Sequence, residues 1–453
     1  MSEAVATPAA SRAAWKWMTL ADVGKVITGN TPPTADAENY GDAIPFVKPT
    51  ELVDRGIRSA PSGLAPQAMG KARVVPAGAV LVSCIGNLGK TGIAKVPVAF
   101  NQQINAVVFN ENVIPEFGFY YAQTLKPWLY GESSATTIPI VNKGKFQQAR
   151  FPLAPLDEQR EIVAELEKQF SRLDEAVANL QRVKANLKRY KASVLKAAVE
   201  GRLVETEATL ARREGRTFET GEQLLQRILE ERRAKWRGKG RYKEPVAQTA
   251  EFTIAVTDGW TSATVDQLAS VQLGKMLDKQ KHKAGEPYRY LRNINVRWGT
   301  FDVSDVFEMN FESDELERFS VRAGDVLVCE GGEPARAAVW RAKQTDMKYQ
   351  KALHRVRFDG AYLPDLIVIA LEHLAKSGAL DELYGGSTIK HFTRETFVKL
   401  VLPVPPAAEQ ARIVAEVDRH LSIIREVEVE VEANLQRAQA LRQATLAKAF
   451  ANT

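Results

Sequence analysis

The stretch with the most direct chemical potential lies at residues 86–91, which read Gly-Asn-Leu-Gly-Lys-Thr. A glycine followed by lysine and threonine ends a phosphate-binding loop, whose backbone N–H groups and lysine hold nucleotide phosphates. The full pattern requires glycine at position 84, where Cys84 stands instead. The corresponding loop in the second half, residues 330–336, has no Gly-Lys-Thr. We therefore interpret residues 86–91 as a tight turn between strands.

Residues 30–34, Asn-Thr-Pro-Pro-Thr, are similar to the Asn-Pro-Pro-aromatic loop of amino-methyltransferases. They contain an inserted Thr31 and lack the aromatic residue on which a target base would stack. No glycine-rich loop after a strand offers a site for S-adenosylmethionine. Cys84 and Cys329 have no metal-type spacing and are expected in strands as small apolar residues. None of the histidines pairs with a cysteine at ligand spacing. The histidines are His282, His354, His373, His391 and His420. The sequence therefore predicts a chain with no catalytic residues, no metal site and no cofactor of its own.

Polar loops beside apolar strands favour a different function, the reading of DNA. Asn and Gln amides can bond two positions of an adenine edge, and Arg or Lys can bond two positions of guanine. The two halves repeat the loop frame with different side chains, as two readers of different sequences would require. A solvated loop residue remains the alternative at each single position. The candidate DNA-binding residues are Asn87, Lys90, Asn101, Gln102, Gln103, Asn142, Lys143 and Lys145 in the first half, and Arg292, Asn293, Arg336, Lys351, His354, Lys390 and His391 in the second.

A basic stretch at residues 232–243 holds seven Lys or Arg residues, two aromatic residues and no acidic residue. Such a stretch could bind nucleic-acid phosphates. It could equally be a solvated connector, and the sequence leaves both interpretations open.

Two long helices are expected to position these loops. Each begins after prolines with the pattern Glu-Gln-x-x-Ile-Val, at residues 158–163 and 409–414. Apolar residues then recur with the spacing of a coiled-coil seam, which predicts two helices of roughly 40 residues, about 60 Å long. The expected seam residues are Leu166, Phe170, Leu173, Val177, Leu180, Val183, Leu187, Tyr190 and Val194 in the first helix, and Val417, Leu421, Ile424, Val427, Val431, Leu435, Ala438 and Leu441 in the second. We expect the two seams to pair antiparallel; the alternative is that each helix packs on its own neighbouring domain.

Length and composition set the outer limits. A chain of 453 residues exceeds one core and should hold at least two domains. It contains no apolar run of about 18 residues and no N-terminal segment typical of a signal peptide, so we expect a cytoplasmic protein. The net charge of +6 is compatible with a polyanionic partner.

The two halves repeat each other at an offset of roughly 250 residues, which indicates a duplicated domain-plus-helix unit. The predicted fold class is α+β, with two duplicated mixed α/β domains separated by a long antiparallel helix pair and related by approximate two-fold symmetry. That symmetry would match the dyad of duplex DNA. The matched segments are 17–20 with Trp260 and the residues after it, 76–82 with 322–328, 100–103 with 349–352, and 137–138 with 388–389. The predicted division is a disordered leader (1–14), a first domain (15–155), a central long helix (156–203), a linker with a short helix (204–258), a second domain (259–405) and a C-terminal long helix (406–453).

With these motifs in view, the chain resembles the DNA-specificity subunit of type I restriction-modification systems. The resemblance covers nearly the whole chain after the leader, and the duplicated helix start makes it specific. The second domain departs from the pattern, because it lacks the Gly-x-Thr-Pro turn and the Asn-Gln-Gln triplet of the first. The residues that carry the resemblance are 29–33, 83–90, 101–106, 137–139 with Asn142 and Lys143, 155–160 and 190–203.

The resemblance implies two target recognition domains, each reading half of a bipartite DNA sequence. It implies two methyltransferase subunits that bind S-adenosylmethionine, and optionally two restriction subunits, motor-nucleases that use ATP and Mg. The residues that would then dock the methyltransferase subunits are Glu158, Gln159, Arg160, Glu409, Gln410 and Arg412. The alternative function is a coiled-coil adaptor that binds proteins without reading DNA.

Overall fold

The computed structural model describes residues 15–134, 137–237, 240–248, 256–276, 285–343, 346–386 and 390–451. The predicted leader, His282 and the pair Thr388 and Ile389 lie outside the described residues. The chain divides into unit 1, Met1–Arg182 with Val431–Thr453, and unit 2, Val183–Glu430. No helix in the described ranges has both the length and the apolar character needed to cross a membrane.

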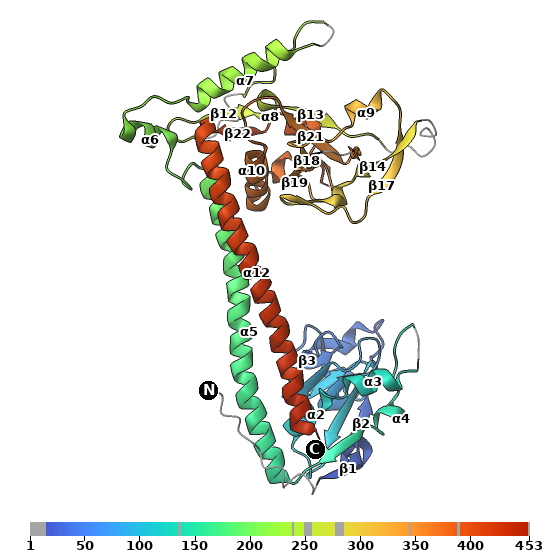
Figure 1. Ribbon diagram of the computed structural model, residues 1–453. Helices are drawn as coiled ribbons and strands as arrows, with labels where there is room; N and C mark the ends of the chain where they lie inside the picture. Colours follow the sequence, from blue (N-terminus) through green and yellow to red (C-terminus); the bar gives the residue numbers. More distant parts are fainter. Residues whose placement is uncertain are drawn as a thin grey trace. The chain divides into compact units, whose positions relative to one another are not determined.

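Unit 1 is built on two sheets and one strand pair (Figure 1). The central sheet runs in the order β2 (Gly24–Thr28), β10 (Ile104–Phe109), β7 (Val80–Ser83), β8 (Thr91–Ala94) and β4 (Arg55–Ile57). A second sheet has the order β5 (Gly63–Leu64), β3 (Tyr40–Val47), β9 (Val98–Phe100) and β6 (Val74–Val75), and β1 (Lys16–Thr19) pairs with β11 (Arg150–Leu153). Because β7 and β8 form an antiparallel hairpin with Val82 opposite Thr91, the interpretation of residues 86–91 as a tight turn is confirmed.

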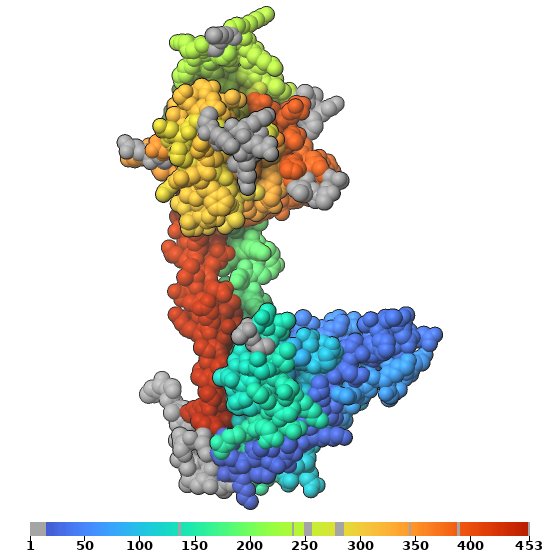
Figure 2. All heavy atoms as spheres, turned by 90° about the vertical axis from the view of Figure 1, so that its right-hand side faces the viewer, coloured from blue at the N-terminus to red at the C-terminus, as the bar shows by residue number. Residues whose placement is uncertain are grey.

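The helices of unit 1 cover one side of its central sheet. They are α1 (Leu20–Val23), α2 (Pro115–Ala122), α3 (Lys126–Glu132) and α4 (Lys143–Phe146), with short 3-10 turns η2 (Ala37–Asn39) and η3 (Pro66–Ala68). Helix α2 begins at Pro115, because proline suits the first helical turn. The end of the chain completes this core, with the Phe450 ring 5.2 Å from Phe117 and 5.3 Å from Tyr121. Figure 2 shows the C-terminal end of α12 (red) directly against the teal α2–α4 region.

Unit 2 repeats the central sheet and, like unit 1, has a second sheet beside it. The repeated sheet has the order β13 (Ala269–Leu273), β21 (Leu353–Phe358), β18 (Val326–Cys329) and β19 (Ala337–Val339), and β12 (Thr261–Thr264) pairs with β22 (Val401–Val404). The second sheet has the order β17 (Phe307–Phe311), β14 (Glu286–Leu291) and β20 (Lys348–Tyr349), in which β14 and β20 pair parallel as β3 and β9 do in unit 1, and β15 (Val296–Arg297) pairs with β16 (Thr300–Phe301). The helices are α6 (Glu207–Glu214), α7 (Gly221–Lys235), α8 (Val265–Leu268), α9 (Glu315–Arg318), α10 (Pro364–Ser377) and α11 (Arg394–Phe397), with 3-10 turns η5 (Asn293–Asn295) and η6 (Asp381–Leu383).

The two long helices, α5 (Leu156–Val199) and α12 (Ala407–Phe450), each have 44 residues, and both begin in one unit and end in the other. In unit 1 the start of α5 lies beside the end of α12 (Figure 1), where Arg442 donates to Asp174 at 2.8 Å. In unit 2 the end of α5 faces the start of α12, where the Tyr190 hydroxyl lies 2.8 Å from His420 Nδ1. Inside each unit the helices therefore pair antiparallel, as expected, and each also packs on its neighbouring sheet region.

Parts of the predicted seam are wrong. Val183, Tyr190 and Leu441 are 38 %, 46 % and 58 % exposed, because a pair of helices covers only a narrow stripe of each. Leu446 and Phe450, outside the predicted seam, are buried in the core of unit 1.

The repeat itself has a register different from the one predicted at its start. β1 follows Trp15 and β12 follows Trp260, so Trp15, rather than Trp17, corresponds to Trp260. In the central segment, α7 lies where a helical piece was predicted, whereas α6 was not predicted.

Candidate nucleic-acid interface

In unit 1 the predicted polar loops meet at one end of the central sheet. Backbone hydrogen bonds join them: Gly86 N–H donates to Pro139 O at 2.9 Å, Val141 N–H to Cys84 O at 2.9 Å, and Cys84 N–H to Gln103 O at 2.8 Å. We call residues 84–90, 101–103 and 137–142 the loop edge of unit 1. Three segments that are separated by 11 and by 34 positions in sequence therefore form one surface.

Among the candidate residues of this unit, Lys90 and Lys143 make no ion pair within the described ranges, and Asn87 and Gln102 carry neutral amides. Lys90 is half-buried, and the other three are exposed. The Gln102 carboxamide is oriented by Thr31, whose hydroxyl donates to Gln102 Oε1 at 2.7 Å. An exposed amide held by a second side chain is suited to contact with a base edge.

The other candidates of unit 1 shape the loops. Asn101 is only 9 % exposed, and its Nδ2 donates to Gln103 Oε1 at 2.9 Å while its Oδ1 accepts from Gln103 N–H at 3.2 Å. Asn142 caps α4 by accepting from Lys145 N–H at 2.9 Å, as a helix N-cap should. Lys145 Nζ donates to the backbone of Glu132 at 2.9 Å.

Unit 2 builds the same edge from corresponding loops. Glu330 N–H donates to Ala352 O at 2.9 Å, Phe392 N–H to Glu330 O at 2.7 Å, and Lys351 N–H to Lys275 O at 2.8 Å. Residues 330–336, 350–352 and 390–392 are therefore the loop edge of unit 2. The frame is repeated, whereas the side chains on it differ.

At this second edge, Lys351 and His391 are exposed. Lys390 is also exposed and pairs with Asp381 at 2.9 Å. Arg336 instead holds the loop together, donating to Glu333 Oε2 at 2.6 Å and to Asn293 O at 2.8 Å.

Two further candidates lie on the 3-10 turn beside this edge. Asn293 Nδ2 donates to Gly331 O at 3.3 Å. Arg292 stacks over Phe307, 3.7 Å from the ring centroid, and bonds Asp305 at 2.8 Å. Asn293 therefore supports the loop edge through Gly331, whereas Arg292 is held by Phe307 and Asp305 outside that edge.

The prediction that His354 contacts DNA is wrong for this conformation. Its side chain is fully buried, and Nε2 donates to Phe392 O at 2.8 Å in the neutral tautomer. Burial lowers the pKa of His354 to about 4. Both faces of strand β21 are covered at this position. The alternation of side chains along the strand therefore could not show which of them reach solvent.

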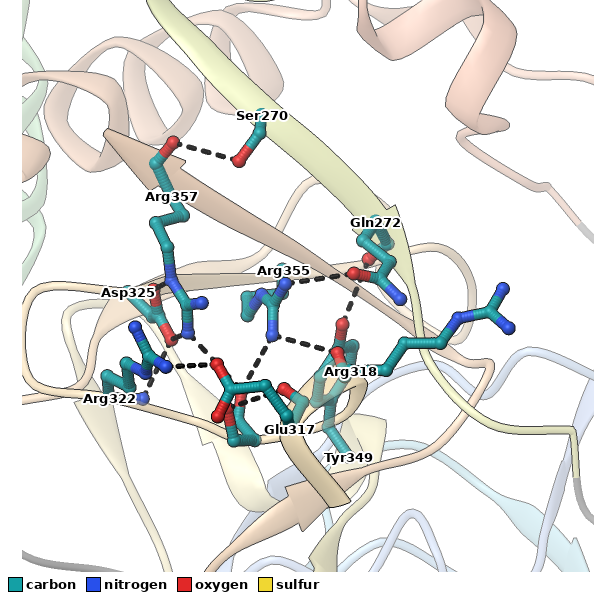
Figure 3. A network of polar contacts seen from close by, with 10 residues as sticks. Ser270, Gln272, Glu317, Arg318, Arg322, Asp325, Tyr349, Arg355 and Arg357 are labelled. Atoms are coloured by element: carbon teal, nitrogen blue, oxygen red, sulfur yellow. Dashed lines mark hydrogen bonds and ion pairs between the residues drawn. The ribbon is translucent and has the colours of Figure 1, made fainter. Parts of the chain in front are cut away.

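Behind the loop edge, unit 2 carries a polar network that ties α9 to the sheet (Figure 3). Arg355, 6 % exposed, donates to Ser320 O at 2.7 Å and to Gln272 Oε1 at 2.9 Å. Arg357 makes two bonds of 2.7 Å to the Asp325 carboxylate. The network therefore fastens the end of α9 and the residues after it to the central sheet.

The predicted docking role of the Glu-Gln pairs is also wrong for the glutamines. Gln159 is fully buried: its Oε1 accepts from Ile114 N–H at 2.8 Å, and its Nε2 donates to Asn112 O at 2.9 Å and Ala154 O at 2.8 Å. Gln410 repeats this role, accepting from Leu363 N–H at 2.8 Å and donating to Pro405 O at 2.9 Å. Each glutamine therefore fastens its long helix to the sheet region before it.

The glutamates bind the tryptophans that precede the first strands. Trp15 Nε1 donates to Glu158 at 2.8 Å, and Trp260 Nε1 donates to Glu409 at 2.9 Å. Glu409 is fully buried, which raises its pKa, and it also accepts from Glu207 N–H at 2.8 Å.

The two arginines of the helix starts also make contacts within the chain. Arg160 is exposed and pairs with Asp157 at 2.5 Å, and Arg412 pairs with Glu207 at 2.7 Å. Of the predicted docking residues, Arg160 is the one most open to a partner.

No group of His, Cys, Asp and Glu side chains able to hold a metal ion occurs in the described part of the chain. Cys84 and Cys329 are free and buried, and burial raises the pKa of these thiols to about 12 and about 11. The arrangement is that of a binding protein, in which a repeated frame carries two loop edges with different side chains.

Comparison with known proteins agrees with that class. The family described as "Type I restriction modification DNA specificity domain" matches residues 13–188. The type I restriction enzyme EcoBI specificity subunit of Escherichia coli is 22 % identical over 449 residues, covering 96 % of this chain and 85 % of the relative. The EcoKI specificity subunit of Escherichia coli strain K12 is 23 % identical over 457 residues, covering 96 % and 88 %. The match to the MjaIX specificity subunit of Methanocaldococcus jannaschii is 26 % identical and spans 34 % of this chain and 37 % of that relative.

A solved structure on "complex assembly and conformational transition of the type I R-M system" contains a chain with the same fold. Its TM-score is 0.63 at 18 % identity, with 96 % of this chain and 97 % of that chain covered. By these comparisons the chain is similar to the DNA-specificity subunits of type I restriction-modification systems.

Proposed function

We propose that this subunit recognises a bipartite DNA sequence, with the loop edge of each unit contacting one half. The observation that carries the proposal is the repeated edge. Equivalent backbone bonds build it at residues 84–90 and at residues 330–336, while the side chains presented there differ. Two half-sites of different sequence require such a combination of constant frame and variable surface.

In unit 1 the chemistry of the edge divides into two roles. Gln102, oriented by Thr31, is the residue best placed to read a base, and an amide suits adenine. Lys90 and Lys143 would bind phosphates, which positions a protein on DNA without reading its sequence. In unit 2, Lys351 and His391 would contact DNA, with Lys390 released from Asp381 on binding.

The subunit would direct chemistry that its partners perform. Two methyltransferase subunits would supply S-adenosylmethionine, and two restriction subunits, where present, would supply ATP and Mg. Exposed positions along α5 and α12, including Arg160, remain available for docking. Gln159, Glu409 and Gln410 are buried within the chain and are not part of that surface.

An adaptor that binds only proteins is the alternative function. The chain would then place its methyltransferase partner on DNA without sequence preference. The test is to map methylated bases in DNA from cells that express the subunit with the methyltransferase of its own system. We expect one motif with two defined halves and a fixed gap. Methylation without a motif, or at a single continuous motif, would refute the proposal.

A matched pair of variants sharpens this test. Gln102→Ala should relax the preference at one position in one half of the motif, because the amide that reads the base is lost. Gln169→Ala removes an exposed glutamine of α5 that donates to Glu165, and it should leave the motif unchanged.

A further inference from the structure

The basic stretch after α7 has no role in either loop edge. Its described residues, 232–237 and 240–246, are called the basic loop here. Figures 1 and 2 show the end of α7 and the residues after it (light green) at the periphery of unit 2. Its exposed charged residues include Arg237, Arg241 and Lys243.

Hydrogen bonds hold the two ends of the basic loop close together, which a simple connector would not require. At one end, the Arg232 guanidinium donates to the backbone oxygens of Asp266 and Gln267, the latter at 2.9 Å. At the other end, Val246 N–H donates to the Asp266 carboxylate at 2.8 Å. Thr264 Oγ1 donates to Val246 O at 2.6 Å. Both ends are thus held at one residue, as in compact surface loops that often carry function.

Aromatic contacts hold the loop in shape. The rings of Trp236 and Tyr242 meet edge to face with centroids 6.0 Å apart. The Arg233 guanidinium lies 5.9 Å from the Tyr242 ring centroid and pairs with Glu244. The charges are therefore displayed on an ordered surface.

Most of the positive charge at the tip is not neutralised. Lys235 pairs with Glu231 at 3.2 Å and Arg233 with Glu244. In contrast, no ion pair to a carboxylate involves Arg237, Arg241 or Lys243 within the described ranges. Favourable interaction with the helix dipole explains cations in the last turn of α7, but it decays beyond that turn. The three cations after the helix need another explanation.

The basic loop lies away from the loop edge of unit 2. Lys235 Nζ donates to Asp359 O at 3.0 Å, directly after the end of β21. The loop edge lies at the start of that strand, next to Leu353, and six residues of strand span about 20 Å. A duplex read at the loop edge would meet the basic loop only outside the bases being read.

We propose that the basic loop binds the phosphate backbone of duplex DNA outside the half-site read by unit 2, without reading sequence. The inference rests on the proposed function, because it assumes that this subunit lies on DNA. Exposed, unpaired Lys and Arg release counterions when they neutralise phosphates, which gives affinity that depends on salt.

The experiment compares two double variants in the complex with the methyltransferase partner. Arg241→Gln with Lys243→Gln removes two unpaired charges of the loop. Arg212→Gln with Arg213→Gln is the control: it removes the same charge from exposed residues of the same central segment. The two control arginines already pair with Asp258 and Glu205 at 2.7 and 2.8 Å. The affinity of each complex is measured at 50 to 200 mM salt, with duplex DNA that carries the motif identified by methylation mapping.

Each lost phosphate contact reduces the slope of log affinity against log salt by about 0.9, so the loop variant should lose about 1.8. Between 50 and 200 mM salt, its affinity should therefore fall about 12-fold less than that of the wild type. The control should keep the wild-type slope, and both variants should methylate the wild-type motif. An unchanged slope in the loop variant, or an equal change in both variants, would overturn the inference.

Loss of partner binding by the loop variant alone would also overturn it, since the loop would then be a protein contact. The failure of the proposed function looks different, because no variant and no wild-type complex would then methylate a defined motif.

Discussion

Replacing the buried glutamine at the start of the first long helix tests how unit 1 is held together. Gln159→Leu keeps a similar volume but removes the partner of one N–H and two C=O groups, those of Ile114, Asn112 and Ala154. A buried polar group left without a partner costs about 1–3 kcal/mol, and part of this is offset by burying leucine. We expect the free energy of unfolding of unit 1 to fall by about 2–4 kcal/mol.

The assay is urea unfolding of the purified chain, followed by tryptophan fluorescence and by limited proteolysis that locates the destabilised unit. Gln169→Leu is the matched control, because this glutamine lies on the same helix but is exposed, and it should change stability by no more than about 0.5 kcal/mol. Gln410→Leu should weaken unit 2 in the same way, through Leu363 and Pro405.

The outcome that refutes the reasoning is equally specific. If Gln159→Leu were as stable as the control and lost only its affinity for the methyltransferase partner, Gln159 would be a docking residue. The buried hydrogen bonds would then contribute little to the fold.

Three other perturbations have defined outcomes. Burial lowers the pKa of His354 from 6.5 to about 4. The contribution of the neutral side chain to stability is therefore complete above pH 6.5 and is lost as the pH falls toward 4. The thermal unfolding temperature of His354→Leu should depend less on pH over this range than that of the wild type. Lys143→Gln should weaken DNA binding at all sequences and reduce the salt slope by about 0.9, whereas a change of motif would assign Lys143 to base reading. Inserting four residues within 178–188 lengthens α5 by about 6 Å, close to one turn, and should favour motifs whose gap is about one or two base pairs longer; methylation mapping that finds the original gap would show that helix length does not set it.

Local sequence patterns predicted much of the fold. The prolines before each Glu-Gln pattern and the spaced apolar residues predicted two helices that the structure contains, each of 44 residues. These features depend on neighbours in sequence, which a single sequence displays directly.

Contacts between residues far apart in sequence could not be predicted from such patterns. Gln159 resembled a surface residue because its partner Ile114 lies 45 positions earlier, and His354 resembled a loop residue because the covering Phe392 lies 38 positions later. The missed helix α6 did have local signals, since Thr206 caps its start and Gly215 ends it with φ of 67°. Its short, highly charged sequence concealed them.

The central claim is that two independent units each read one half of a DNA sequence. Its most direct test is a chimera in which residues 15–150 come from a relative with a different, mapped motif, expressed with the same methyltransferase partner. Mapping of methylated bases should show the half-site of the relative joined to the unchanged second half, with the original gap. A chimera that methylates DNA but has both halves altered, or neither, would contradict the account.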